Sequence, residues 1–205
     1  MSYKNFYEKS AAKSYNKKKK PSKPTRQRIG DYQLFIGAFP TGELADQIQR
    51  IRGEVDGKSI TIVDPHVTVA GTYWRNGKAT RAGAQGLIDR LDRLSPKLKS
   101  FELDMGGVYT FGKRVIYLGV RPTDPLLAIR AHLVNTIGED KHRRFRPHLT
   151  LALDLEDASF AAALAELKEG ELGNGRFSAP IAELRLMQRA EGEHAWRVIH
   201  TIALG

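Results

Sequence analysis

The chain has 205 residues, and 41% of them are hydrophobic, which is enough apolar material for a globular body. It contains no cysteine, so disulfide frameworks, thiol catalysis and cysteine-ligated zinc or iron–sulfur centres are excluded. There is no apolar run of about 18 residues and no apolar signal-peptide core, which predicts a soluble, cytoplasmic protein without membrane contact.

Positive charge is concentrated at the N-terminus. The formal net charge is +10, with 33 Lys and Arg against 23 Asp and Glu. Residues 1–28 hold ten of these Lys and Arg and a single acid, Glu8, so they account for +9 and leave +1 for residues 29–205. Their lysine-rich, aperiodic sequence predicts a disordered basic tail. Such a tail can bind a polyanion such as RNA, or serve as a solubilising extension or a targeting signal.

The first half of the body alternates strand and helix patterns. An apolar segment typical of a strand is stopped by Pro40, and the next segment places Leu44, Ile48 and Ile51 on one helical face. A later leucine-rich segment also has helical spacing and ends at a Ser-Pro pair. The predicted elements are a strand at 32–40 and helices at 43–52 and 80–94.

The second half repeats this alternation and adds strands. A segment rich in β-branched residues is stopped by Pro122, and apolar residues then recur at helical spacing. Near the C-terminus, Val198, Ile202 and Leu204 are expected core positions of a last strand. The predicted elements are strands at 99–105, 108–112, 115–120, 181–189 and 196–204, and helices at 124–137 and 158–168. Helices mixed with mostly antiparallel strands indicate an α+β fold.

The two halves match each other at a constant offset of 82 residues. Chance can supply one match, but hardly a strand, a proline, a helix and a histidine motif in the same register. The offset predicts a duplicated lobe, so that residues 29–205 form one domain of two lobes. The matching pairs are Gly37 and Gly119, Pro40 and Pro122, Thr41 and Thr123, Leu44 and Leu126, and the segments 65–69 and 147–151.

Each half contains a His-x-Thr motif within this repeat. Residues i and i+2 of a strand point to the same face, so His66 and Thr68 project together, as do His148 and Thr150. If a pseudo-two-fold axis relates the halves, the two pairs face each other across one cleft. A single His-x-Thr is a weak signal, because a strand histidine is commonly only hydrogen-bonded and half-buried. Two of them, in register with the repeat, indicate a functional site.

Two imidazoles and two hydroxyls suit displacement at phosphorus. One imidazole can take a proton from the attacking oxygen while the other gives one to the leaving oxygen, and the hydroxyls can hold phosphate oxygens. A metal site fits less well, because hydroxyls are poor zinc ligands and Asp64, two residues before His66, is matched by Arg146 in the second half. We therefore expect no metal and no other cofactor. The remaining histidines are expected to be structural or at the surface: His132, His142, His194 and His200.

With their flanking residues, the motifs resemble those of the 2H phosphoesterases, in the bacterial and archaeal branch known as 2'-5' RNA ligases or RNA 2',3'-cyclic phosphodiesterases. The resemblance covers residues 30–205 and rests on segments 65–69 and 145–151, strand 34–38 and hairpin 111–120. Val69 stands where leucine is more usual, and residues 70–74 depart from the usual apolar run before a substrate-facing loop. The implied fold is bilobal and α+β, a pseudo-two-fold duplication of antiparallel sheets with flanking helices around a central cleft.

The same resemblance implies a metal-independent hydrolase that opens RNA 2',3'-cyclic phosphate ends to 2'-phosphates. His66 would be the acid that protonates the 3' oxygen and His148 the base that activates water, although pseudo-symmetry makes the two sites alike. Thr68 and Thr150 would hold the phosphate oxygens. Run in reverse with a 5'-hydroxyl RNA end, the site could form a 2'-5' linkage. The expected partner is RNA with such ends, tRNA-like fragments included, and the expected state is a monomer.

Five further residues are candidates for RNA contact. Arg146 precedes the second motif on the same strand face and can meet phosphate, as can Lys113 and Arg114 in the central hairpin. Tyr109 and Phe111 can stack on a base. The alternative for all five is a solvated basic loop with ordinary core aromatics.

Two other functions stay open from the sequence. The near-neutral body also suits 2'-5' oligoadenylate or another small cyclic nucleotide, whereas the basic tail favours RNA. A non-catalytic RNA-binding protein with a vestigial site is disfavoured, because both motifs keep their His and Thr. Turnover assays on RNA and on mononucleotides distinguish the three.

Overall fold

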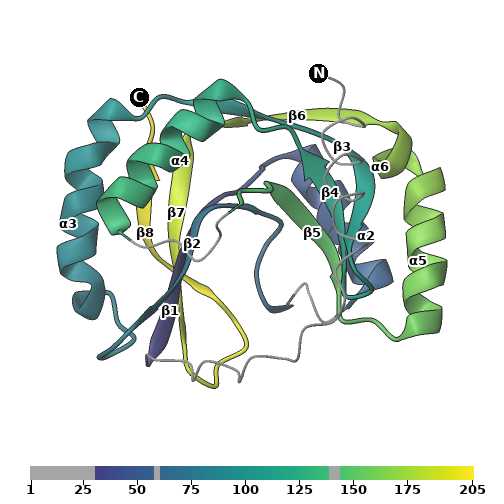
Figure 1. Ribbon diagram of the computed structural model, residues 1–205, viewed down its shortest axis with the longest axis horizontal. Coiled ribbons are helices and arrows are strands. Elements are labelled where there is room, and N and C mark those ends of the chain that lie inside the picture. Colours follow the sequence, from purple (N-terminus) through teal and green to yellow (C-terminus); the bar gives the residue numbers. More distant parts are fainter. Residues whose placement is uncertain (1–30, 58–60, 139–143) are drawn as a thin grey trace.

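The computed structural model describes residues 31–57, 61–138 and 144–205, and the basic tail predicted for residues 1–28 lies outside them. Within this part of the chain, eight strands form one antiparallel sheet in the order β6-β3-β4-β5-β2-β1-β7-β8. Figure 1 shows that the sheet is strongly curled, with helices around its outer side. The strands are β1 (Tyr32–Ala38), β2 (Val67–Arg75), β3 (Phe101–Phe111), β4 (Val115–Val120), β5 (His148–Leu153), β6 (Arg176–Ile181), β7 (Glu183–Ala190) and β8 (Arg197–Ala203).

The helices flank this sheet in two groups. Figure 1 shows α3 and α4 beside the strands of the first lobe and α2, α5 and α6 beside those of the second. None of the helices in the described ranges is both long enough and apolar enough to cross a membrane. Their bounds are α2 (Glu43–Val55), α3 (Gln85–Leu94), α4 (Asp124–Ile137), α5 (Asp157–Glu169) and α6 (Glu171–Asn174).

The duplication expected from the sequence is confirmed by two matching units, β1–α2–β2–α3 and β4–α4–β5–α5. If 82 is added to its residue numbers, β1 corresponds to 114–120 and α2 to 125–137. These ranges start within one residue of β4 and α4 and end at the same residues as those elements. The register is lost after the starts of β2 and β5, because β2 runs on to Arg75 and a longer loop precedes α3, so that α3 and α5 start only 72 residues apart. The fold is therefore the expected α+β duplication of antiparallel sheets with flanking helices.

The two lobes are joined at the middle of the sheet and exchange elements. β2 pairs with β5 through Val67 and Leu149. Helix α2 packs against β5 and α4 packs against β2, so each lobe is covered by a helix of the other. The C-terminal strands β7 and β8 return to the first lobe, where β7 pairs with β1. Because of these exchanges, one hydrophobic core extends across both lobes.

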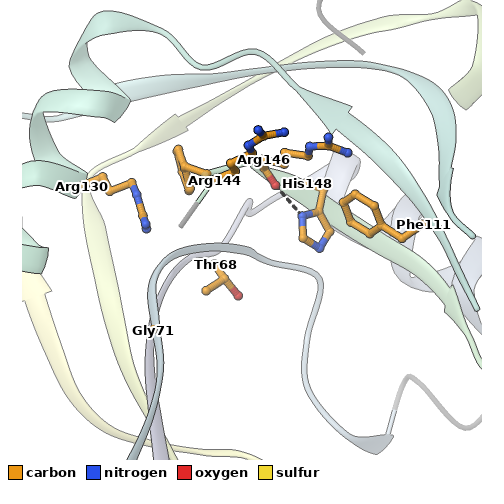
Figure 2. Close-up of a pocket in the computed structure, with 8 residues that line it drawn as sticks. Thr68, Gly71, Phe111, Arg130, Arg144, Arg146 and His148 are labelled. Carbon is orange, nitrogen blue, oxygen red and sulfur yellow. Dashed lines mark hydrogen bonds between the residues drawn. The ribbon is translucent and has the colours of Figure 1, made fainter. Parts of the chain in front are cut away.

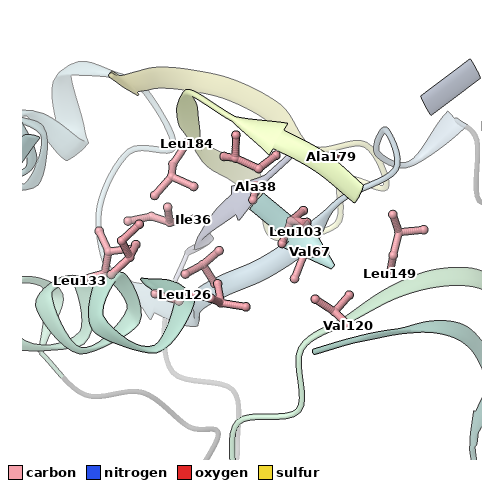
Figure 3. Close-up of a cluster of buried hydrophobic side chains, with 14 of the residues drawn as sticks. Ile36, Ala38, Val67, Leu103, Val120, Leu126, Leu133, Leu149, Ala179 and Leu184 are labelled. Atoms are coloured by element: carbon pink, nitrogen blue, oxygen red, sulfur yellow. The ribbon is translucent and has the colours of Figure 1, made fainter. Parts of the chain in front are cut away.

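The core is made by the alternating inward residues of the strands and the apolar face of α4. Ile36 of β1, Leu126 and Leu133 of α4, and the central pair Val67 and Leu149 are almost completely buried. Figure 3 shows these side chains gathered between the sheet and the helix. Burying one such side chain contributes about 1.5–3 kcal/mol relative to exposure, so the join between the lobes is strongly stabilised.

The break predicted between two strands in the centre of the chain was wrong. The segments 99–105 and 108–112 form one strand, β3, with an irregular register between Met105 and Val108. Gly107, at φ +73°, absorbs the irregularity, and the Gly-Gly pair that resembles a turn in the sequence is a β-bulge. Residues 70–74, expected before a loop, continue β2 to Arg75.

Other predictions need correction at the edges of the fold. The helix predicted over 80–94 begins as α-helix only at Gln85, after a 3₁₀ turn at Ala82–Ala84. Strand β6 and helix α6 were not predicted; β6 is an edge strand and contains Pro180, which edge strands tolerate. Val198 is 48% exposed, because a bulge in β8 turns Ile199 into the core in its place. Ile202 is buried as expected.

We expect Leu149→Ala to lower the free energy of unfolding by about 2–5 kcal/mol, because it leaves a cavity at the join of the two lobes. Urea denaturation followed by circular dichroism measures the change. The matched control is Leu153→Ala on the same strand, where the side chain is 40% exposed and the loss should stay below about 1 kcal/mol. Equal losses for the two variants would contradict the packing described here.

Candidate active site

The pairing that joins the lobes also sets the two His-x-Thr motifs opposite each other. The central residues of the motifs are paired, so by the same register His66 lies opposite Thr150, and Thr68 lies opposite His148. Opposed residues of antiparallel strands point to the same face. All four side chains therefore lie on one face of the sheet, and the paired central residues are buried behind them.

Both imidazoles are held by the same hydrogen bond. Nδ1 of His66 lies 2.9 Å from the carbonyl oxygen of Asp64, and Nδ1 of His148 lies 2.7 Å from that of Arg146 (Figure 2). A carbonyl oxygen only accepts, so each Nδ1 carries the hydrogen and donates it. In the neutral ring Nε2 is then a proton acceptor, and in the protonated ring it is a donor.

Aromatic rings surround the first histidine. The ring of His66 stacks on Phe35 at 4.8 Å and on Phe39 at 5.3 Å between centroids, and Trp196 meets Phe35 edge-on at 4.6 Å. The pKa of His66 is lowered to about 4, chiefly by removal of the ring from solvent. The hydrogen bond to the carbonyl of Asp64 opposes this shift, and the positive charges of Arg52 and His148 add to it. His66 is therefore neutral at pH 7, with Nε2 unprotonated.

The second histidine has aromatic neighbours in a different arrangement. His148 meets the edges of Phe111 at 4.8 Å and Tyr117 at 5.2 Å, and these two rings stack on each other at 4.2 Å. Burial raises the pKa of Tyr117 to about 12, so its hydroxyl stays protonated. Tyr117 and Phe35 are 82 residues apart, so the repeat supplies one aromatic ring to each histidine.

A cavity of about 490 Å³ lies beside the second motif. His66 and Thr150 are not among its lining residues, so it occupies the His148 side of the shared face. Figure 2 shows Thr68 and His148 between Arg130 at one end and Phe111 at the other. The described lining residues are Thr68, Gly71, Phe111, Arg130, Arg144, Phe145, Arg146 and His148.

Four of these lining residues were not predicted as site residues from the sequence: Gly71, Arg130, Arg144 and Phe145. Arg130 of α4 donates to the carbonyl oxygen of Val69 at 2.7 Å, and its guanidinium lies 4.2 Å from the ring centroid of Phe145. It is the one Lys or Arg in an otherwise largely apolar helix, a signal that could have marked it. Arg144 ends the basic run that precedes the second motif, which is a weaker signal.

The five candidates for RNA contact separate into two groups. Arg146 and Phe111 line the cavity. Tyr109 is not among its described lining residues, and its ring lies 6.0 Å from that of Tyr117. Lys113 and Arg114 are highly exposed in the turn between β3 and β4, paired with Asp157 at 3.1 Å and Asp154 at 2.7 Å. The structure does not bring these two into the cavity.

The described histidines outside the two motifs lie at the surface or in structural contacts, as expected. His132 and His194 are exposed, and His200 pairs with Asp92 at 2.7 Å between β8 and α3. His142 lies outside the described residues.

Gly71, at φ +118°, lies where a Cβ would come within 2.8 Å of the backbone of Phe35, so the close approach of β1 to β2 requires glycine here.

A curled antiparallel sheet of two repeated lobes, with paired His-x-Thr motifs on its central strands, defines the 2H phosphoesterase class. The family model of the 2'-5' RNA ligase superfamily matches residues 40–193. The chain belongs to this superfamily, as its motifs indicated, and membership places it among the phosphoesterases that act on phosphodiesters.

Relatives and solved structures agree with this assignment. Proteins of Bacillus mycoides and Bacillus cytotoxicus, provisionally named phosphoesterases, are each 26% identical over 176 residues, covering 84% of this chain and 97% of theirs. The fold is similar to that of E. coli LigT in apo form, at TM-score 0.60 and 18% identity over 85% of this chain and 99% of LigT. For E. coli LigT complexed with 3'-AMP the TM-score is 0.58 and the identity 19%, over 85% of this chain and 98% of LigT. For the protein TT0787 of Thermus thermophilus the TM-score is 0.59 and the identity 17%, over 84% of this chain and 97% of TT0787.

The lowered pKa of His66 predicts a specific acid sensitivity of the fold. Between pH 6.5 and 4 the unfolded chain takes up a proton at this histidine that the folded protein does not, so stability falls as the pH falls. Between pH 7 and pH 4.5, we expect the free energy of unfolding to fall by about 2 kcal/mol less in His66→Gln than in wild type. This number follows from the lowered pKa of His66 at about 1.4 kcal/mol per pKa unit.

Urea denaturation at the two pH values measures this difference. The matched control is His132→Gln on the exposed side of α4, which should keep the acid sensitivity of the wild type. If His66→Gln lost as much stability as the control, the lowered pKa described for His66 would be contradicted.

Proposed function

We propose that this chain is a phosphodiesterase that opens RNA 2',3'-cyclic phosphate ends to 2'-phosphates, with His66 and His148 as its acid–base pair and no metal. The observation that carries the proposal is the orientation of the two imidazoles. Each keeps its Nδ1–H on a backbone carbonyl, which leaves Nε2 for proton transfer on a face shared with two threonine hydroxyls. Membership of the superfamily, and the binding of 3'-AMP by E. coli LigT, support a substrate of this chemical kind.

The reaction makes one bond to phosphorus and breaks another. The water oxygen bonds to phosphorus as the bond to the 3' oxygen breaks; one Nε2 takes the proton of the water and the other gives its proton to the 3' oxygen. The products are a 2'-phosphate and a 3'-hydroxyl, and the two histidines exchange their extra proton with solvent. Thr68 and Thr150 donate to the non-bridging oxygens, where they stabilise the charge that develops in the transition state.

The pKa of His66 favours one division of roles. The resemblance to the family assigns the acid to His66, but an acid must hold a proton, and burial keeps His66 neutral at pH 7. A neutral ring with Nδ1 protonated suits the base that activates water. We therefore propose the reverse order, with His66 as the base and His148, which lines the cavity, as the acid.

Turnover tests the pair. We expect wild type to hydrolyse an RNA oligomer ending in a 2',3'-cyclic phosphate in the presence of EDTA, with a 2'-phosphate as product. His66→Ala and His148→Ala should each reduce kcat by about a hundredfold or more, because each removes one proton transfer. Activity that survives both substitutions would mean that another site does the chemistry, and no turnover by folded wild type would overturn the proposed substrate.

A substrate with a good leaving group distinguishes the acid from the base. Bis(p-nitrophenyl) phosphate releases p-nitrophenolate, which needs little protonation, so loss of the acid matters less than loss of the base. We expect His148→Ala to retain activity within about tenfold of wild type on this compound, while His66→Ala remains impaired. Release of p-nitrophenol measures both, and the reverse pattern would restore the acid role to His66.

The same residues can serve two related reactions. Attack by a 5'-hydroxyl RNA end in place of water would form a 2'-5' linkage, which is the ligase reaction in the name of the superfamily. A 2'-5' oligoadenylate or a small cyclic nucleotide would present the same phosphorus to the same histidines. The basic tail at residues 1–28 favours RNA among these, since its charge would add phosphate contacts.

A further inference from the structure

The cavity beside the second motif carries more positive charge than one cyclic phosphodiester needs. Arg130, Arg144 and Arg146 line it together with Thr68 and His148, and none of the described lining residues is a carboxylate. A cyclic phosphodiester bears a single negative charge. Three guanidinium groups around one monoanion indicate that the cavity receives additional negative charge from the ligand.

The position of Arg130 shows where that charge would lie. Its guanidinium is held by the carbonyl of Val69 at 2.7 Å and by the face of Phe145 at 4.2 Å. In Figure 2 it lies at the end of the cavity away from Phe111, and the motif residues Thr68 and His148 lie between. The cavity thus has an aromatic end, a central phosphate site and a cationic end.

A nucleotide at the 3' end of an RNA has the same order of groups. Its cyclic phosphate lies on one side of the ribose, and its 5' phosphate lies on the other, joined to the preceding nucleotide. The volume of about 490 Å³ is within the range of pockets that hold a small ligand, which suits one terminal nucleotide with both phosphates. A free nucleoside 2',3'-cyclic phosphate would place no phosphate at the cationic end.

Resting on the proposed function, we infer that Arg130 and Arg144 form a subsite for the 5' phosphate of the terminal nucleotide. The subsite would make the enzyme selective for the ends of RNA chains over free nucleoside 2',3'-cyclic phosphates. Arg146, which presents its backbone carbonyl to His148, stays with the reacting phosphate.

The test compares two substrates that differ only in this phosphate: adenosine 2',3'-cyclic phosphate with and without a 5'-phosphate. We expect wild type to favour the 5'-phosphorylated compound by about tenfold or more in kcat/KM, the size of a charge-assisted phosphate contact. Arg130→Gln and Arg144→Gln should each lower this ratio to about threefold or less. Arg130→Gln keeps most of the aliphatic stem of the half-buried Arg130, and Arg144 is exposed, so neither variant removes a buried apolar side chain.

The matched control is Arg50→Gln, which removes an exposed arginine of α2 paired with Glu54 and should leave the ratio unchanged. Equal kcat/KM for the two substrates in wild type would overturn the subsite and leave the proposed reaction intact. If wild type turned over neither substrate, the proposed reaction itself would fail. Calorimetric binding of the same two compounds would then decide the subsite, and equal affinities would overturn it.

Discussion

The pairing of Val67 in β2 with Leu149 in β5 joins the lobes and aligns the two motifs. Side chains alternate along a strand, so a slip of one residue in this pairing would turn one His-x-Thr motif into the core and expose its apolar partner. The register is specified by burial, because Val67, Val69, Leu149 and Leu151 are completely removed from solvent. The hydrophobic effect behind the sheet thereby sets which side chains share the face in front of it.

The scaffold is nearly symmetric, but the site is not. The repeat supplies each lobe with a histidine, a threonine, a backbone carbonyl for Nδ1 and an aromatic ring from the neighbouring strand. His66 stacks on Phe35 and Phe39, whereas His148 meets Phe111 and Tyr117 at steep angles beside a cavity lined by arginines. The two imidazoles therefore start from the same tautomer but experience different surroundings. This difference separates the proposed base from the proposed acid and gives the bound nucleotide a direction.

Much of the fold could be predicted because its signals are local. The strand before Pro40, the helix at 124–137 and both motif strands follow from composition, periodicity and proline stops. The errors come from places where pairing with distant strands overrides the local pattern. The Gly106-Gly107 pair resembles a turn, but the strand continues through it, because Met105 and Val108 both pair with β4 and Gly106 pairs with β6. Among the described strands, the edge strand β6 pairs only with β3. Similarly, Val198 is displaced from the core by a bulge against β7.

The duplication, the four motif residues and their common strand face can be read from the sequence, because a period of two and an 82-residue offset are visible along the chain. The packing of the folded chain decided that α4 crosses to the other lobe, which brings Arg130 to the carbonyl of Val69, 61 residues away in the chain. It also decided that Lys113 and Arg114 pair with Asp157 and Asp154 outside the cavity. Such placements depend on which elements pack together, and packing between distant segments leaves no periodic signal in the sequence.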